Sequence, residues 1–300
     1  MVEVDGRELK LTNLDKVLYP AVGFTKGEVV DYYAKVADAM VPHLSGRAVT
    51  LRRFPEGVED LDSAFFEKRC PKHRPKWVKT TSVRAGPNAG NIDFCVCDGR
   101  PTLIWMAQLA SIELHPSLSL GRAPTRPTVL AFDLDPGPPA DIVDCCRVAI
   151  RLREMFGHFG VQSFPKTSGS KGMQVYVPIN KKTSYDVTKP FAKAIAQLME
   201  KQTPDLVVSK MKKVEREGKV MVDWSQNHRS KTTIAVYSLR ARERPTVSTP
   251  ITWEEVERAA DSGDGSHLVF EADDVLKRIE QHGDLFAPVL ELQQDLPDLV

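Results

Sequence analysis

The sequence predicts an α+β protein in which a single domain of two packed lobes spans residues 1–300. Two patterns carry this prediction. Between residues 128 and 180 a strand, a helix and two further strands follow one another, which is the order of a compact unit built on one sheet. Two β-like runs, 219–226 and 233–239, then flank a polar loop and predict a hairpin that pairs with those strands. The sequence has no internal repeat and no low-complexity tract, and its only linker-like stretch lies in the acidic C-terminal part, so independent domains are not predicted.

Local signals predict the elements of the first half. Thr25 and Glu28 have the spacing of a capping box, and the apolar residues behind them recur at helical intervals. This pattern predicts a helix over 26–41. A strand is predicted over 48–54, and the apolar run TLIWMAQLASIEL predicts a helix over 102–114.

The second half contains the regular unit and one later helix. The first strand of this unit ends at Pro136-Gly137. The second and third strands of the unit are separated by a polar loop. The predicted elements are a strand at 128–135, a helix at 139–158, a strand at 161–164, a loop at 166–172, a strand at 173–179 and a helix at 187–201. Residues 261–266 read as a linker within an acidic C-terminal part.

The composition is ordinary for a globular protein, but the charge is segregated. The net charge is +1, with 42% hydrophobic and 27% charged residues. A basic segment without acids consists of Lys68, Arg69, Lys72, Arg74, Lys76, Lys79 and Arg84. Such segregation permits a polyanionic partner, although a solvated surface would have the same composition. No apolar run approaches the roughly 20 residues of a membrane helix, and no secretion signal begins the chain, so a cytoplasmic protein without a membrane partner is expected.

The cysteines do not predict a disulfide framework. There are five of them, an odd number, which favours a reducing compartment. Cys70, His73, Cys95 and Cys97 together offer four potential zinc ligands. Cys95 and Cys97, however, lie in an apolar strand-like run and are more tightly spaced than most structural zinc ligands. Zinc is therefore not expected.

Three aspartates are the strongest candidates for a functional site. Asp133 and Asp135 are separated by one residue in the strand VLAFDLDPG, so both side chains project from the same face. Asp223 ends a second apolar strand-like run, VMVD. Two adjacent carboxylates repel each other, and three converging ones can hold two divalent cations. The sequence therefore predicts a divalent metal site, with solvated strand ends as the plain alternative.

Three other groups of residues have both a functional and a plain interpretation. The loop KTSGSKG at 166–172 offers glycines, hydroxyls and lysines to a triphosphate, but a hairpin turn has the same composition. Arg240 and Arg242 project from one face if extended, which suits phosphate oxygens or solvent equally. Phe65 and Phe66 precede the basic segment and would stack on exposed bases or pack in the core.

The motifs DLDPG, TSGSKG, VDWSQN and KTTIAVYSLR, in this order, resemble the polymerase domain of bacterial ligase D, in the archaeo-eukaryotic primase superfamily. The similarity extends over nearly the whole chain and includes TNLDKVLYP, TKGEVVDYY and AFFEK. It implies a primase-like core of mixed and antiparallel sheets flanked by helices. It also implies template-dependent nucleotidyl transfer with two Mn²⁺ or Mg²⁺ ions and a preference for ribonucleotides. No ligase-like or nuclease-like segment is seen, so a stand-alone or excised polymerase domain is expected.

The resemblance also implies roles for individual residues. The catalytic metal ligands would be Asp133, Asp135 and Asp223. The incoming nucleotide would contact His115, Ser168, Lys171, Gln174, Arg240 and Arg242. A downstream 5′-phosphate would bind Asn13, Lys16 and Lys26, and the template base would stack on Phe65 and Phe66. Gln174 departs from the family, which usually has a His there. Residues 84–100 also differ from the family's end-bridging loop, which favours gap filling, as in excision repair, over joining of broken ends.

The expected partners follow from this activity. They are gapped or broken double-stranded DNA with a downstream 5′-phosphate, NTPs and dNTPs, a DNA ligase and an end-binding protein, with nucleoid association during repair. Two other functions stay open from the residues alone. The D-x-D motif also fits an aspartyl phosphotransferase with Asp133 as nucleophile, and the basic segment fits a non-catalytic module that binds DNA ends.

Overall fold

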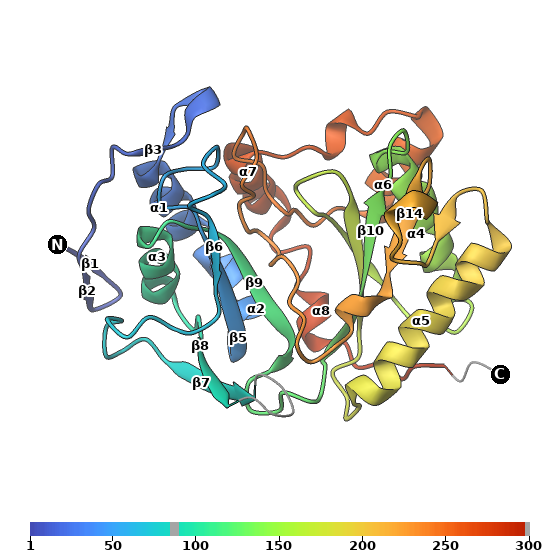
Figure 1. The fold of residues 1–300 in the computed structure, drawn as a ribbon, viewed down its shortest axis with the longest axis horizontal. Helices are drawn as coiled ribbons and strands as arrows, with labels where there is room; N and C mark the ends of the chain where they lie inside the picture. Colours follow the sequence, from blue (N-terminus) through green and yellow to red (C-terminus); the bar gives the residue numbers. More distant parts are fainter. Residues whose placement is uncertain (85–89, 298–300) are drawn as a thin grey trace. The chain divides into compact units, whose positions relative to one another are not determined.

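The computed structural model describes residues 1–84 and 90–297 and separates the chain into two compact units (Figure 1). Unit 1 consists of Met1–Arg122, Thr232–Ser248 and Glu271–Asp284. Unit 2 consists of Ala123–Lys231, Thr249–Phe270 and Leu285–Val300. Each unit is therefore assembled from segments that are distant in the sequence. The single domain over residues 1–300 stays a prediction.

Unit 1 is built on a five-stranded sheet whose central strand is β5. β5 pairs antiparallel with β6 and β8 and, along its other edge, with β9. The strands of this sheet are β5 (Arg47–Arg53), β6 (Phe65–Glu67), β7 (Thr80–Arg84), β8 (Asn91–Cys95) and β9 (Ser111–Leu120). Two short antiparallel pairs are formed by β1 (Val2–Val4) with β2 (Arg7–Leu9), and by β3 (Val17–Tyr19) with β4 (Phe24–Thr25). The strand predicted over 48–54 is confirmed.

The capping box at Thr25 starts the helical part of unit 1. The Thr25 hydroxyl accepts from the Glu28 N–H at 3.2 Å, and the Glu28 carboxylate accepts from the Thr25 N–H at 2.7 Å. The helices of unit 1 are α1 (Lys26–Lys35), α2 (Ala37–Leu44), α3 (Arg100–Gln108), α7 (Ala272–His282) and the 3₁₀ turn η1 (Pro20–Val22). The single helix predicted over 26–41 is wrong in one respect. It is divided at Val36, where ψ of −4° departs from the ideal α-helical value of about −42°.

The helix predicted over 102–114 is wrong in its C-terminal half. α3 ends at Gln108, and Ala110 adopts a left-handed conformation with φ of 56°. The residues after it form β9, in which Leu114 pairs with Leu51 and His115 pairs with Thr50. The run SIEL is apolar enough for either element, so pairing with the distant β5 decides its conformation.

Unit 2 is built on a second five-stranded sheet with the order β11-β12-β10-β14-β13. Its pairings are antiparallel except for β13 with β14, which is parallel. The strands are β10 (Val129–Pro136), β11 (Phe164–Thr167), β12 (Met173–Pro178), β13 (Val207–Val208) and β14 (Val220–Asp223). The predicted order of strand, helix, strand and strand is confirmed. β11 lies further along the chain than the predicted 161–164 and includes the first residues of the predicted loop.

The three longer helices of unit 2 pack on one face of this sheet and bury its apolar side chains. Leu130, Phe132 and Leu134 of β10 are fully buried in a core that also contains residues of α4 and α5. The helical segments are α4 (Ile142–Gly157), α5 (Tyr185–Gln202), α6 (Trp253–Ser262) and α8 (Pro288–Glu291), with 3₁₀ turns η2 (Lys213–Arg216), η3 (Trp224–Gln226) and η4 (Ser266–Leu268). Because side chains alternate along a strand, Asp133 and Asp135 lie on the opposite face of β10.

The predicted hairpin of 219–226 and 233–239 is wrong. Its first run forms β14 in unit 2, whereas the second is irregular and belongs to unit 1. The second run lies alongside β9, where the Ala235 N–H donates to the Leu114 carbonyl at 2.9 Å. Tyr237 then adopts φ of 65°, so the segment cannot continue as a strand.

Cys70 and Cys95 form a disulfide, contrary to the expectation from the odd cysteine count. The bond joins the basic segment to the end of β8. It occupies two of the four potential zinc ligands that the sequence suggested. Burial raises the pKa of the Cys97 thiol to about 12, so this third cysteine stays protonated at neutral pH. In the described part of the chain, no helix has the length and apolar character needed to cross a membrane.

Candidate active site

The antiparallel pair β10–β14 brings the three predicted aspartates to neighbouring positions. Asp133 lies directly opposite Asp223 in the register, and Asp135 lies two residues further along β10. Directly opposed residues of an antiparallel pair share one face of the sheet, as do residues i and i+2. The backbone of unit 2 therefore collects three carboxylates on one sheet face.

Each of these carboxylates has a different protein partner. Asp133 Oδ1 accepts from Gln174 Nε2 at 3.0 Å, and Asp135 Oδ2 accepts from Arg216 Nη1 at 3.3 Å. Asp223 caps η3 by accepting from the Ser225 N–H at 2.8 Å. Among the described residues, no group of three or more His, Cys, Asp and Glu side chains is arranged to hold a metal ion. The backbones of the three aspartates are thus neighbours in the sheet, while each aspartate side chain is held by a different hydrogen-bond donor.

The electrostatics around Asp133 nevertheless suit a cation. Its pKa is raised to about 6, first by burial and then by the charges of Asp223 and Asp135, while the hydrogen bond from Gln174 acts in the opposite direction. Gln174 is buried, and its Oε1 has no hydrogen-bond partner within the described residues. Hard carboxylate and amide oxygens are the donors that Mg²⁺ and Mn²⁺ prefer. The donor set therefore fits a divalent ion.

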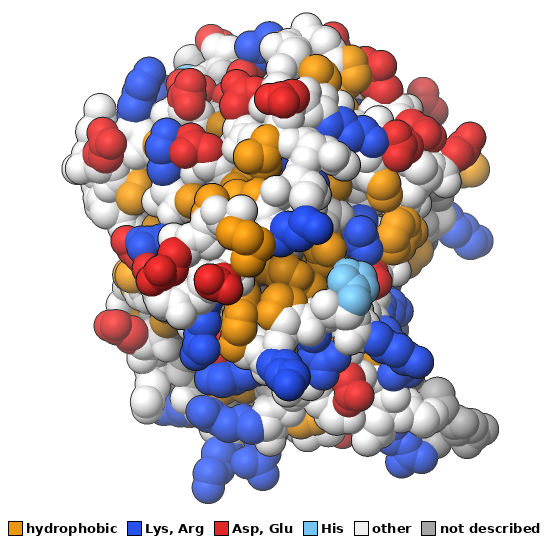
Figure 2. All heavy atoms as spheres, turned by 90° about the vertical axis from the view of Figure 1, so that its left-hand side faces the viewer, with side chains coloured by type: hydrophobic (Ala, Val, Ile, Leu, Met, Phe, Trp, Pro, Cys, Tyr) orange, Lys and Arg blue, Asp and Glu red, His pale blue; other side chains and the backbone are white. Residues whose placement is uncertain are grey.

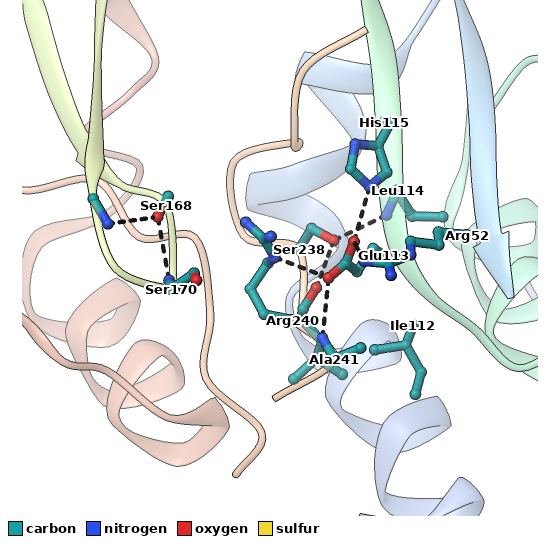
Figure 3. A network of polar contacts seen from close by, with 12 residues as sticks. Arg52, Ile112, Glu113, Leu114, His115, Ser168, Ser170, Ser238, Arg240 and Ala241 are labelled. Carbon is teal, nitrogen blue, oxygen red and sulfur yellow. Dashed lines mark hydrogen bonds and ion pairs between the residues drawn. The ribbon is translucent and has the colours of Figure 1, made fainter. Parts of the chain in front are cut away.

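The Gly-Ser loop after β11 lies against β10, the strand that contains Asp133 and Asp135. Ser168 Oγ accepts from the N–H groups of Ser170 and Gly172 at 3.2 and 3.3 Å, which stabilises the turn (Figure 3). A Cβ atom on Gly172 would lie 2.0 Å from the Leu134 carbonyl oxygen, so only glycine allows this close approach. Because Leu134 lies between Asp133 and Asp135, the loop is adjacent to the carboxylates, and Lys171 is exposed on it.

In unit 1, a buried carboxylate gathers two of the predicted nucleotide-binding residues. Figure 3 shows Glu113 at the centre of a polar network with Arg52, His115, Arg240 and Ala241. Glu113 was not predicted from the sequence. Glu113 and His115 are two residues apart, a spacing that places both side chains on one face of a strand. The helix predicted over 102–114 included Glu113 and ended just before His115, so this strand face was not recognised.

Arg240 and Arg242 differ in their surroundings. The side chain of Arg240 is only 13% exposed and pairs with Glu113, whereas Arg242 is exposed at the surface of unit 1. Partial desolvation, together with the charges of Arg240 and Arg52, lowers the pKa of Arg242. The backbone before them is anchored by buried tyrosines: Tyr19 Oη donates to the Arg240 carbonyl at 2.9 Å.

The three residues predicted to bind a 5′-phosphate are brought together at the start of α1. Lys16 N–H donates to the Asn13 carbonyl at 3.2 Å, and Lys26 N–H donates to the Lys16 carbonyl at 2.8 Å. Lys26 is buried and its Nζ donates to the Thr12 carbonyl at 2.9 Å. Burial, followed by the charges of Lys16 and Arg53, lowers the pKa of Lys26. Two lysines therefore repel each other at a helix N-terminus, where an anion would be stabilised.

Phe65 and Phe66 lie on β6 and are exposed, with 42% and 56% of their surfaces accessible. The alternative that they pack in the core is therefore ruled out. Arg52 lies over the Phe66 ring at 5.3 Å, and the His115 ring meets the same ring edge-on at 5.4 Å. Phe66 thus adjoins the Glu113 network.

The basic segment follows β6 at the surface of unit 1. Lys68, Arg69, Lys72, Lys76 and Lys79 are all exposed. Figure 2 shows Lys and Arg side chains gathered on the lower part of the face that it draws. Part of the stretch 84–100, which differs from the family's end-bridging loop, lies at 85–89, outside the described residues.

Comparison with known proteins identifies a family model and relatives that match most of the chain. Residues 25–286 match the family model described as LigD, primase-polymerase domain. The chain is 43% identical over 283 residues to the multifunctional non-homologous end joining protein LigD of Mycolicibacterium smegmatis, covering 94% of this chain and 36% of that protein. It is 30% identical over 291 residues to the bifunctional non-homologous end joining protein LigD of Bacillus subtilis, covering 97% of this chain and 45% of that protein.

A solved structure of a ligase D polymerase domain is also similar to this chain. The polymerase domain of Mycobacterium tuberculosis ligase D in complex with DNA matches with a TM-score of 0.86 and 40% identity, over 94% of this chain and 98% of that one. The α+β fold is therefore confirmed, and its class is that of a DNA-directed nucleotidyltransferase of the primase-polymerase type. The chain belongs to the family of LigD primase-polymerase domains. This family is metal-dependent. The chain spans about a third to a half of the length of the two LigD proteins from Mycolicibacterium smegmatis and Bacillus subtilis.

Proposed function

We propose that the chain is a template-dependent polymerase that extends a DNA primer, fills short gaps and remodels broken ends, with ribonucleotides preferred. The observation that carries this proposal is the β10–β14 pair, with Asp133 opposite Asp223 and Asp135 on the same face. Membership of a polymerase family favours this function over an aspartyl phosphotransferase and over a non-catalytic end-binding module.

Asp133, Asp135 and Asp223 would hold two Mn²⁺ or Mg²⁺ ions. Bound there, divalent ions supply the positive charge that activates a primer 3′-hydroxyl and neutralises the leaving pyrophosphate. Gln174 keeps one oxygen of Asp133 in place by donating from Nε2, and, because it is an amide, it does so at any pH. Gln174 here replaces the usual His of the family, so the orientation of Asp133 does not depend on the protonation of an imidazole.

The remaining residues of the chain would bind and orient the substrates. The side chains assigned to the incoming nucleotide are His115, Ser168, Lys171, Gln174, Arg240 and Arg242. Fixed cationic groups hold a triphosphate in line for attack and stabilise the charge that develops on it. Phe65 and Phe66 would stack on the template base, which suits exposed aromatic rings beside arginines.

The DNA itself would be bound at two places in unit 1. Asn13, Lys16 and Lys26 would bind the 5′-phosphate of the downstream strand, since a phosphate relieves the repulsion between the two lysines. The basic segment would contact the phosphate backbone. Gapped DNA with a phosphorylated downstream strand is therefore the proposed substrate.

The setting of this activity is a proposal as well. The relatives are named as end-joining proteins, which supports repair of broken ends, together with a DNA ligase and an end-binding protein as partners. Gap filling in excision repair is the second setting, favoured by the departure at residues 84–100. In either case the protein would act in the cytoplasm at the nucleoid.

Primer extension across a short DNA gap tests the proposal. Mn²⁺ and Mg²⁺, NTPs and dNTPs, and 5′-phosphate and 5′-hydroxyl ends are compared with the wild-type protein, with Asp133→Ala and with Asp205→Asn. Asp205 is an exposed acid of unit 2 without a proposed role. We expect templated addition that falls at least about a thousandfold in Asp133→Ala, as for loss of a central catalytic group, and that is unchanged in Asp205→Asn.

The same assay tests the phosphate site. Lys16→Ala should remove stimulation by the 5′-phosphate without changing extension beside a 5′-hydroxyl. Wild-type protein that adds no nucleotide with either metal would refute the polymerase. Wild-type addition that is indifferent to the 5′-phosphate would refute the phosphate site alone.

A further inference from the structure

We propose that Glu113 is a positioning residue, whose buried carboxylate orients His115 and Arg240 for the incoming nucleoside triphosphate. This inference rests on the proposed function, because it explains how two of the side chains assigned to the nucleotide are held. Glu113 itself is only 1% exposed, so it does not offer its carboxylate to a ligand.

The carboxylate is shared between two pairs of donors. Oε2 accepts from His115 Nε2 at 3.0 Å and from Arg52 Nη1 at 3.1 Å. Oε1 accepts from Arg240 Nε at 3.0 Å and from the Ala241 N–H at 3.1 Å. Burial alone would raise the pKa of Glu113, but the hydrogen bond from His115 and the charges of Arg240 and Arg52 hold it well below the ordinary value. Glu113 is therefore ionised whenever the enzyme works.

The bond to Glu113 determines the tautomer of His115. An ionised carboxylate only accepts, so His115 must carry its proton on Nε2. Burial lowers the pKa of His115, against the opposing effect of Glu113, which favours the neutral ring. In the neutral ring, Nδ1 is a hydrogen-bond acceptor. The edge-on contact with Phe66 fixes the other side of the imidazole, so Nδ1 is presented in one direction.

Arg240 is held through both its side chain and its backbone. The Nε bond to Glu113 sets the plane of the guanidinium, because the fork is rigid. The Arg240 carbonyl accepts from Tyr19 Oη at 2.9 Å, and its N–H donates to the Thr246 carbonyl at 2.8 Å. The arginine therefore loses little conformational freedom when a phosphate binds, which is the advantage of preorganisation.

The charge balance of the network also suits a triphosphate. Two guanidinium groups, of Arg52 and Arg240, face the single carboxylate of Glu113. Positive charge therefore remains in excess after pairing. Buried ion pairs contribute little net stability once the cost of removing the charges from water is counted, so stability alone is a weak explanation for this network.

Steady-state primer extension with variants of Glu113 tests this role. Wild-type protein is first shown to add nucleotides, so that failure of the polymerase itself is recognised separately. For Glu113→Gln we expect the KM for the NTP to rise about tenfold or more while kcat changes less than about threefold, since a binding orientation is lost. Glu113→Asp keeps the charge and should recover part of this loss. Glu257→Gln removes a carboxylate that pairs with Arg153 in unit 2 and should leave both constants unchanged.

A double-mutant comparison keeps the test decisive if Glu113→Gln does not fold. His115→Ala is made in the wild-type and in the Glu113→Asp background, and the melting temperature of each variant is recorded. If Glu113 acts through His115, the two effects on KM are not multiplicative, because one interaction is removed twice. Folded Glu113→Gln with an unchanged KM would overturn the proposal, and multiplicative effects of the two substitutions would overturn the role of Glu113 toward His115.

Discussion

At the scale of single residues, Asp133 is placed where its charge is unfavourable in the folded protein. It lies opposite Asp223 and two residues from Asp135, and among the residues that the structure describes only Gln174 donates a side-chain hydrogen bond to it. Burial and the two neighbouring charges raise its pKa to about 6. Such strain is typical of a functional site, where the fold tolerates a loss of stability for the sake of ligand binding.

Replacement of this residue should therefore stabilise the protein. The folded-state pKa of about 6 lies above the unfolded value of about 3.9, so stability is present below about pH 4 and is lost as the pH rises to about 6. Asp133→Asn removes this loss, and we expect about 1 to 3 kcal/mol of added stability at pH 7.5. Thermal unfolding of both proteins from pH 4 to pH 8, in the presence of a chelator, measures the difference.

The control for this prediction is the low-pH end of the same series. At pH 4 the two proteins should melt at similar temperatures, because Asp133 is protonated in the folded state. A stabilisation of equal size at all pH values would show that charge is not its cause. Nucleotidyl transfer should be lost in Asp133→Asn throughout.

At the scale of elements, the junction between α3 and β9 determines where Glu113 and His115 are placed. Ala110 is buried and has φ of 56°, a left-handed conformation that disfavours residues with a Cβ atom. This single residue ends the helix and lets the next ten residues pair with β5. The helical pattern of the sequence continues through it, which is why the predicted helix was too long.

Glycine should be better than alanine at this junction. Ala110→Gly relieves the left-handed strain, and we expect the free energy of unfolding to rise by up to about 1 kcal/mol. Ala107→Gly, within α3, is the matched control and should lower it by about 1 kcal/mol. Urea unfolding of the two variants gives both values, and a loss of stability in Ala110→Gly would contradict the inferred role of this residue.

At the scale of the whole molecule, local charge matters more than the net charge of +1. The basic segment is exposed in unit 1, and acids elsewhere in the chain balance it. Long-range attraction for DNA therefore depends on where the charges are, because exposed charges are screened beyond about 8 Å at physiological salt.

Reversing charges in this segment should weaken DNA binding in a salt-dependent way. For Lys72→Glu combined with Lys76→Glu, we expect lower affinity for gapped DNA and a plot of log K against log salt that is shallower by about 2. Lys277→Glu, an exposed lysine on α7, is the control and should leave this slope unchanged. An equal loss of affinity at every salt concentration would indicate damage to the fold instead.

Features that depend on short-range order could be predicted from the amino-acid sequence alone. The spacing of Asp133 and Asp135, the strand-helix-strand-strand order and the capping box at Thr25 all follow from local periodicity and hydrogen-bonding capacity. The motifs also identified the family, since they occur in a characteristic order along the chain. Three other features became apparent in the folded structure: residues 111–120 form a strand, residues 233–239 do not pair as the predicted hairpin, and Cys70 bonds to Cys95. These outcomes depend on pairing between distant segments, whose energies no local pattern contains. Glu113 acquires its four donors for the same reason: they come from β5, β9 and the segment after Tyr237, which meet only in the folded chain.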